Sequence, residues 1–154
     1  MDIEKDKFIL NGKDVSKDIR TPRVSGLVSF VARIKRVREK LVELQREISR
    51  GKNVVLDGRD IGTVVFPNAP LKIFLIASPE ERAKRRMKEY EEKGIKEDFE
   101  AVLANIKERD MIDSTRSEGP LKKADDAVEI DTSFMTIEEV TDEITRLVKE
   151  KTGE

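Results

Sequence analysis

The sequence predicts an α/β fold in which helices flank a parallel sheet. Three segments, at 53–57, 72–77 and 127–132, are expected to be strands, and the apolar run at 53–57 lacks the alternation of a half-exposed strand, which suits a strand buried on both faces. Segments with helical spacing at 79–93 and 97–113 separate the last two of these strands. This alternation of strand and helix predicts a parallel sheet with right-handed crossovers, and 154 residues suit one domain.

The composition excludes several classes of protein. Lys and Arg number 31 against 32 Asp and Glu, and the net charge of -1 argues against a nucleic-acid coat. No apolar run approaches the roughly 18 residues of a membrane-spanning helix. The charged first residues also lack the apolar core of a signal peptide. We therefore expect a cytoplasmic protein without a nucleic-acid or membrane partner.

Cysteine and histidine are both absent. Their absence excludes disulfides, thiolate zinc sites and catalysis by Ser-His or Cys-His groups. The chemistry of the chain must therefore use carboxylates, arginine, lysine, serine and backbone amides.

The N-terminal residues are expected to form a hairpin. Residues 7–10 suit a strand, Asn11-Gly12 suits a turn with positive φ, and Asp14-Val15 suits a return strand. A lone hairpin needs more sheet to be stable, and nothing upstream is expected to supply it.

Residues 21–50 are expected to form helices. Thr21 or Pro22 opens the first helix, since proline suits a first turn. Gly51 ends the second helix. The two apolar stripes consist of Val24, Leu27, Val28 and Val31, and of Val37, Leu41, Leu44 and Ile48.

The helix at 79–93 begins at a capping box, in which Ser78 is the N-cap and Glu81 stands at N3. Its residues are almost all charged, which is typical of a solvent-exposed element or a mobile flap. Its few apolar residues are Ala83, Met87 and Tyr90, and Arg82, Arg85 and Arg86 share one face. Gly119-Pro120 breaks the next helical region, and Thr136 caps a final amphipathic helix.

Charged residues follow the apolar run at 53–57. Ligands of open α/β sheets bind beyond the carboxyl ends of the strands, where Asp57, Arg59 and Asp60 would stand. An acid there can hold a metal ion through water, and an arginine can hold a phosphate with its planar fork. The alternative interpretation is a strand that ends in an ordinary charged turn.

A second charged group lies near the end of the helix at 97–113. Arg109, Asp113 and Arg116 are spaced by four and three residues, which places them on one face if the helix continues. The residues by themselves favour a surface ion-pair ladder. The other interpretation is a grip on a phosphate and a sugar hydroxyl.

Several stretches together resemble the bacterial cytidylate kinases, in one collinear run over nearly the whole chain. The most specific stretch is the block Asp-Gly-Arg-Asp-Ile-Gly-Thr-Val-Val-Phe-Pro at 57–67. The others include Arg36-Val37-Arg38-Glu39, Ala77-Ser78-Pro79-Glu80-Glu81-Arg82-Ala83, Ile106-Lys107-Glu108-Arg109-Asp110 and the run Ala127–Asp131. The resemblance implies a P-loop nucleoside monophosphate kinase fold. It also implies transfer of the γ-phosphate of ATP to CMP or dCMP, with Mg²⁺ as cofactor.

The resemblance also implies how the acceptor nucleotide is held. Ser29, Arg38 and Asp60 match the readers of the cytosine base. Arg59 and Arg116 match the residues that hold the CMP phosphate.

The remaining assignments concern the ribose and the transferred phosphate. By resemblance, Asp113 reaches the ribose hydroxyls and Arg109 the transferring phosphoryl group. Arg85 and Arg86 match the lid arginines over ATP, and Asp57 matches the acid that polarises magnesium waters.

The sequence contains no Gly-x-x-x-x-Gly-Lys-[Ser/Thr] phosphate loop. By resemblance, residues 1–52 are then the remainder of the nucleotide-binding insert, and 53–154 are the core domain with a lid at about 79–113. The fold is expected to be truncated at the N-terminus, lacking the first strand and this loop.

Three interpretations follow from that departure. The chain is part of a working kinase, or a catalytically inactive remnant that binds nucleotide weakly. In the second interpretation the remnant can instead be half of an assembly, in which another chain or self-association fills the gap in the sheet. In the third interpretation, the two charged helices form a helical scaffold for a partner.

Overall fold

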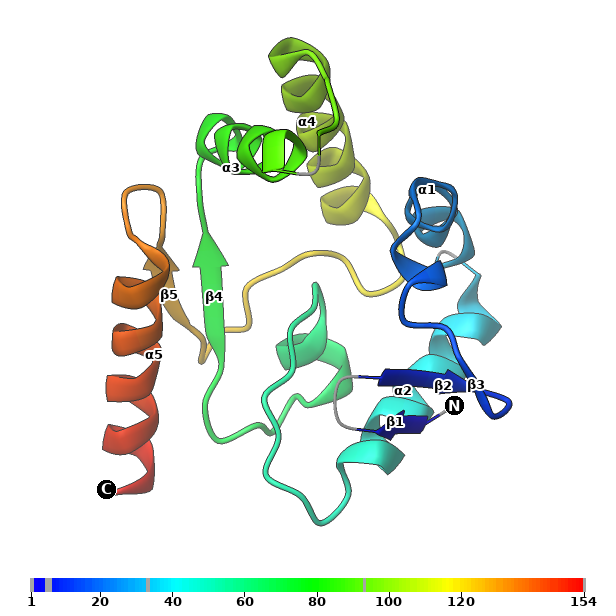
Figure 1. Cartoon of the computed structure of the whole chain (residues 1–154). Coiled ribbons are helices and arrows are strands. Elements are labelled where there is room, and N and C mark those ends of the chain that lie inside the picture. Colours follow the sequence, from blue (N-terminus) through cyan, green and yellow to red (C-terminus); the bar gives the residue numbers. More distant parts are fainter. Residues whose placement is uncertain (1, 5–6, 33, 93, 154) are drawn as a thin grey trace. The chain divides into compact units, whose positions relative to one another are not determined.

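The computed structural model describes residues 2–4, 7–32, 34–92 and 94–153 (Figure 1). The chain divides into two compact units, Met1–Val55 and Leu56–Glu154. Among the described residues, no helix is both long and apolar enough to cross a membrane.

The first unit begins with a three-stranded antiparallel sheet of β1 (Asp2–Glu4), β2 (Lys7–Leu10) and β3 (Lys13–Asp14). The turn between β2 and β3 has positive φ at Asn11 and Gly12, 51° and 78°, which confirms the predicted hairpin. The expectation that nothing upstream extends this sheet was wrong, because β1 pairs with β2.

Helices complete the first unit. They are the 3₁₀ helix η1 (Asp18–Arg20), α1 (Pro22–Val31) and α2 (Lys35–Ser49). Thr21 caps α1 by accepting a hydrogen bond from the Val24 backbone N–H at 3.5 Å. The predicted helical region is thus confirmed, with a break between α1 and α2.

The expected strand at 53–57 was wrong. The segment has no regular secondary structure, and Val54 and Val55 are exposed by 45% and 97%. A strand exists only where its backbone groups pair with a neighbour, and the described strands of the second unit, β4 and β5, pair with each other. Apolar patterning therefore indicated a segment able to form a strand, but it could not supply a partner strand.

A π-helical turn, η2 (Ile61–Val65), follows where sequence patterning indicated no helix. The backbone N–H groups of Val65 and Phe66 donate to the carbonyls of Asp60 and Ile61, five residues earlier. This turn places Val65 in the interior with 1% exposure, so it anchors the segment that carries Arg59 and Asp60.

The sheet of the second unit consists of two parallel strands, β4 (Ile73–Ile76) and β5 (Val128–Asp131). These strands confirm two of the three expected parallel strands. Beyond them, the Thr132 N–H donates to the Ile76 carbonyl at 2.8 Å, which extends the pairing at the carboxyl ends.

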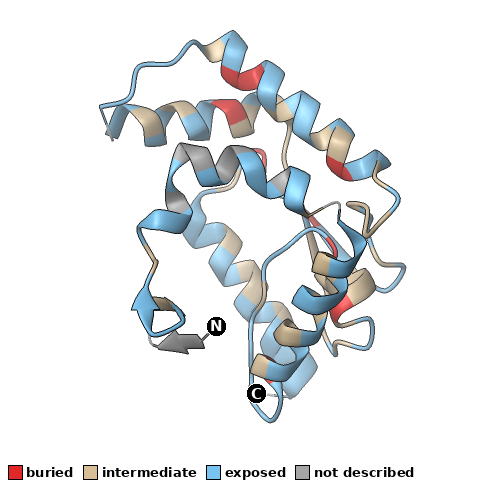
Figure 2. Cartoon of the chain, turned by 90° about the vertical axis from the view of Figure 1, so that its right-hand side faces the viewer, coloured by how far each residue is buried: buried red, intermediate tan, exposed pale blue. Residues whose placement is uncertain are grey.

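Two helices between these strands, α3 (Pro79–Glu92) and α4 (Phe99–Thr115), pack against each other and carry several of the buried positions in Figure 2. Ser78 caps α3 by accepting from the Glu81 N–H, as predicted, but the Ser78 N–H donates to Ser133 Oγ, so the reciprocal half of the predicted capping box is absent from the described residues. Asp98 caps α4 through Ala101. The buried core here is Ala83, Val102 and Leu103, packed against Met87, Tyr90, Phe99 and Ile106. The sparse apolar residues of α3 are therefore all used against α4.

The final helix, α5 (Ile137–Thr152), begins at the predicted Thr136 in a capping box with Glu139. It lies alongside β5 (Figure 1). The amphipathic pattern of this helix predicts a buried stripe of Ile137, Val140, Ile144 and Leu147; the last three are half-buried, whereas Ile137 is 82% exposed.

Candidate functional site

Arg59, Asp113 and Arg116 come together in the second unit. Arg59 Nε donates to Asp113 Oδ2 at 2.8 Å, and Arg116 Nη1 donates to Asp113 Oδ1 at 3.4 Å. The Asp113 and Arg116 side chains are only 8% and 10% exposed, whereas the Arg59 side chain is 49% exposed. One buried carboxylate therefore holds two guanidinium groups, one of which faces solvent.

The end of α4 positions this cluster. Asp113 lies in the last turn of the helix and Arg116 is its C-cap residue. The chain then folds back, because Arg116 Nε donates to the Gly119 carbonyl and the Leu121 N–H donates to the Asp113 carbonyl, both at 2.7 Å. The helix ends at Thr115, four residues before the break predicted at Gly119-Pro120, and the Gly119 carbonyl contributes to the geometry of the site.

A second ion pair lies one turn earlier on α4. Arg82 binds Asp110 with both terminal nitrogens, and Arg82 Nη1 lies 2.8 Å from Asp110 Oδ1. The hydrogen bond from Arg82 holds the pKa of the Asp110 carboxyl below its usual value, and the nearby charges of Arg59 and Arg109 act in the same direction. The same hydrogen bond raises the pKa of Arg82.

Arginine side chains gather around these two acids. Arg59 and Arg116 bind Asp113, Arg82 binds Asp110, and the charges of Arg59 and Arg109 also act on Asp110. Arg109 is exposed and makes no ion pair among the described residues. Guanidinium groups that reach solvent, as those of Arg59 and Arg109 do, are suited to an anionic ligand.

The two predicted lid arginines diverge. Arg85 donates from its terminal nitrogens to the hydroxyl and the carbonyl of Thr132, at the carboxyl end of β5. Arg86 instead pairs with Glu89 at 3.3 Å and lies over the Tyr90 ring, 5.9 Å from its centroid. Arg85 is thus joined to the sheet edge, and Arg86 remains on the surface of α3.

The two predicted acids before η2 differ in exposure. Asp57 is exposed and makes no hydrogen bond among the described residues, while Asp60 is buried with 8% exposure. No group of three or more His, Cys, Asp or Glu that could hold a metal ion lies within the described part of the chain. A single open carboxylate such as Asp57 still fits Mg²⁺, which keeps several waters and takes its other ligands from phosphates.

The other two predicted base readers lie in the first unit. Arg38 stands on α2 and is half-buried, and the Ser29 side chain lies outside the described part of the structure. Their grouping with Asp60 therefore stays a prediction.

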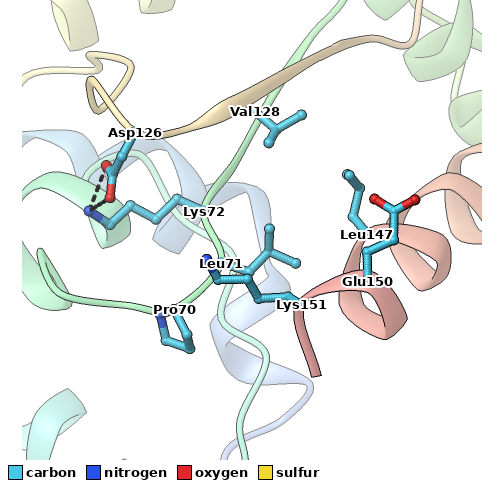
Figure 3. A pocket seen from close by; sticks show the side chains of 8 residues that line it. All are labelled: Pro70, Leu71, Lys72, Asp126, Val128, Leu147, Glu150 and Lys151. Carbon is cyan, nitrogen blue, oxygen red and sulfur yellow. Dashed lines mark hydrogen bonds and ion pairs between the residues drawn. The ribbon is translucent and has the colours of Figure 1, made fainter. Parts of the chain in front are cut away.

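A cavity of about 220 Å³ lies at the other end of the sheet (Figure 3). Its lining residues are Pro70, Leu71, Lys72, Asp126, Val128, Leu147, Glu150 and Lys151. Lys72 Nζ lies 2.8 Å from both oxygens of Asp126, so the two charges match (Figure 3). The cavity flanks the amino ends of β4 and β5, whereas Arg82 joins the arginine cluster to the carboxyl end of β4 through Ala77. Ligands of α/β sheets bind at the carboxyl ends, which favours the arginine cluster as the site.

Sequence reasoning assigned no role to Arg82 or Asp110. The two residues are 28 positions apart, and no local pattern links them. The only signal was the spacing of Asp110 and Asp113 by three, which puts two acids on one helix face.

Comparisons with a family model and with individual proteins point to the same family. A family model described as cytidylate kinase matches residues 1–150. A cytidylate kinase of Fusobacterium nucleatum is 57% identical over 149 residues, which cover 97% of this chain and 68% of the relative. A relative of the same name from Clostridium botulinum is 56% identical, with 92% and 65% covered. One from Lactobacillus johnsonii is 52% identical, with 94% and 63% covered. The chain thus spans about two thirds of the length of these relatives.

Proposed function

Because the chain belongs to the cytidylate kinase family, we propose that its arginine–aspartate cluster binds the phosphate of CMP or dCMP for phosphorylation by ATP. The observation that carries this proposal is the joint hold of Asp113 on Arg59 and Arg116. A carboxylate that fixes two guanidinium groups orients their remaining N–H donors before the ligand arrives, which reduces the entropy lost on binding.

Arg59 is well suited to receive the phosphate. Only its Nε hydrogen bond, to Asp113, occurs within the described residues, so its two terminal nitrogens are available. A guanidinium fork matches two oxygens of a phosphate dianion, and such charge-assisted bonds are about twice as strong as neutral ones. Arg116 supplies a second, more deeply buried positive charge beside it.

The rest of the acceptor nucleotide is assigned by chemistry. A carboxylate such as Asp60 accepts from the cytosine amine, and the Arg38 guanidinium and the Ser29 hydroxyl donate to the ring acceptors. Asp113 has a carboxylate that can also accept from a ribose hydroxyl next to the phosphate.

The remaining charged residues are assigned to ATP, the phosphate donor. Arg109, Arg85 and Arg86 neutralise negative charge on the transferring phosphoryl group and on ATP, and the lid at about 79–113 excludes water. Asp57 holds waters of a magnesium ion, which supplies charge neutralisation on the ATP phosphate oxygens. In this chemistry the protein aligns two substrates and forms no covalent bond to either.

Acceptor binding and turnover must be tested separately, because the 154 residues contain no glycine-rich phosphate loop. Calorimetry should show CMP binding that is at least about tenfold weaker in Arg59→Ala, with cytidine binding unchanged. ADP release with CMP should be followed with and without a peptide that spans the phosphate-loop unit of the family.

The outcomes separate the alternatives. If the chain binds CMP but releases no ADP until the peptide is added, the chain is the nucleotide-binding part of a kinase that another chain completes. Equal affinity of the wild-type chain for CMP and cytidine would refute the proposed phosphate site. The scaffold interpretation predicts that Arg59→Ala leaves nucleotide binding unchanged.

A further inference from the structure

Arg82 is the arginine of this region that has no role in the proposed chemistry. We propose that Arg82 is a positioning residue that occupies Asp110 and so keeps Arg59 and Arg109 available for the substrate phosphate. This inference rests on the proposed function, because it assumes that Arg59 meets an anionic ligand.

Three points of attachment fix the Arg82 side chain. Its Nε donates to the Ala77 carbonyl at 3.1 Å, at the carboxyl end of β4, and its two terminal nitrogens each reach one oxygen of Asp110. The guanidinium therefore joins α3, the sheet edge and α4. Because Arg82 is bound at Nε and at both terminal nitrogens, both oxygens of Asp110 are held and the carboxylate cannot easily rotate toward another donor.

Asp110 would otherwise compete for the arginines of the site. It lies one turn before Asp113 on α4, and the charges of Arg59 and Arg109 already act on its carboxyl group. A carboxylate released from Arg82 would still be attracted by the charges of Arg59 and Arg109. An ion pair formed there would cancel the positive charge that a phosphate needs.

A purely structural role for Arg82 predicts something different. If the ion pair only fastens α3 to α4, then removing either partner or both weakens packing, and ligand binding falls in each case. If Arg82 instead restrains Asp110, then removing the Asp110 charge as well restores phosphate binding. The double variant therefore distinguishes the two roles.

The experiment uses Arg82→Ala, Asp110→Asn, the double variant and the conservative Arg82→Lys. Lys84→Ala is the matched control, because Lys84 lies on the same helix and pairs with Glu81 on the exposed side. Affinities for CMP and for cytidine are measured by calorimetry, and circular dichroism checks that each variant is folded. The Nε–Hε NMR signal of Arg59 reports its partner in the absence of any ligand.

We expect Arg82→Ala to bind CMP about tenfold more weakly than the wild type and to bind cytidine with unchanged affinity. The tenfold loss corresponds to about one charge-assisted contact with the phosphate. The double variant should regain wild-type CMP affinity within about threefold. The CMP affinity of Arg82→Lys should lie between those of the wild type and Arg82→Ala. Asp110→Asn alone should bind CMP at least as tightly as the wild type. A double variant as weak as Arg82→Ala, or a weakened Asp110→Asn, would overturn the proposal.

Two further outcomes keep this inference separate from the proposed function. If the wild-type chain binds no CMP, the proposed function fails, but the Arg59 signal should still move in Arg82→Ala and return in the double variant. A signal that stays unchanged in Arg82→Ala overturns the inference. If Arg82→Ala does not fold, the CMP affinities of Asp110→Asn and Arg82→Lys test the positioning role of Arg82 instead.

Discussion

The two ends of the small parallel sheet hold charge in different ways. At the amino ends, the buried Lys72 amine meets the Asp126 carboxylate and the Pro67 carbonyl, so one cation is fully matched. Near the carboxyl ends, Arg59 and Arg116 share Asp113, and Arg59 keeps half of its side chain in solvent. A matched pair stabilises a fold, whereas an arginine that reaches solvent, such as Arg59, is suited to an anionic ligand.

Asp113→Ala should have the largest effect, because it leaves two arginines without their shared counter-charge. Removing one partner of a buried ion pair costs about 3–5 kcal/mol, and the exposure of Arg59 favours the lower end. Urea unfolding should show the loss. Asp142→Ala, an exposed acid on α5, is the control and should unfold like the wild type. A loss below about 1 kcal/mol would mean that Asp113 does not hold the cluster together.

Arg59→Ala and Lys72→Met should have opposite effects on stability and binding. Arg59→Ala should lower CMP affinity more than about tenfold but cost less than about 1 kcal/mol in unfolding free energy, since the pair is half-exposed. Lys72→Met should cost about 1–3 kcal/mol, because Lys72 is only 7% exposed at its side chain, and it should leave CMP affinity unchanged. If both variants lost CMP binding equally, the two ends would not differ as described.

Acid should weaken both ends of the sheet through one carboxyl group each. Hydrogen bonds from Arg82 and Lys72 hold the pKa of Asp110 and of Asp126 below the ordinary value of 3.8. A depressed pKa stabilises the folded state above the unfolded pKa, and this contribution is lost as the pH falls through the folded value, below about 4.

Urea midpoints between pH 6 and pH 2.5 should therefore fall less steeply in Asp110→Asn and in Asp126→Asn than in the wild type. Because both carboxyl groups are partly or largely exposed, the flattening should be small. Slopes identical to the wild type in both variants would show that neither ion pair contributes to acid sensitivity.

Lys84→Ala should have the smallest effect. Lys84 pairs with Glu81 on the exposed side of α3, with its own side chain 63% exposed. Such pairs contribute at most about 0.5 kcal/mol, so the urea midpoint and CMP affinity should both stay close to wild type. A larger change would mean that exposed charges on α3 matter as much as those facing α4.

The sequence predicted those parts of the structure that depend on local chemistry. The caps at Ser78 and Thr136, the hairpin turn at Asn11-Gly12 and the helix spacing of Asp113 and Arg116 are each specified by neighbouring residues. These features followed from hydrogen bonding and periodicity within a few positions.

The parts that depend on distant partners could not be predicted. The apolar run at 53–57 has the composition of a buried strand, but no ladder forms there and Val55 is exposed. Arg82 and Asp110 meet only because α3 packs on α4, and a single sequence gives no sign of that contact. The family resemblance supplied the proposed role of Arg59, and the structure added the carboxylate that holds its guanidinium group.

The most direct test of the account follows the arginine side-chain NMR signals while CMP is added. If the arginine cluster binds the phosphate, the signals of Arg59 and Arg116 should shift with CMP, cytidine should leave them in place, and the Lys72 amine signal should move with neither ligand. Shifts at Lys72 without shifts at Arg59 would place the ligand at the amino ends of the sheet and contradict the proposed phosphate site.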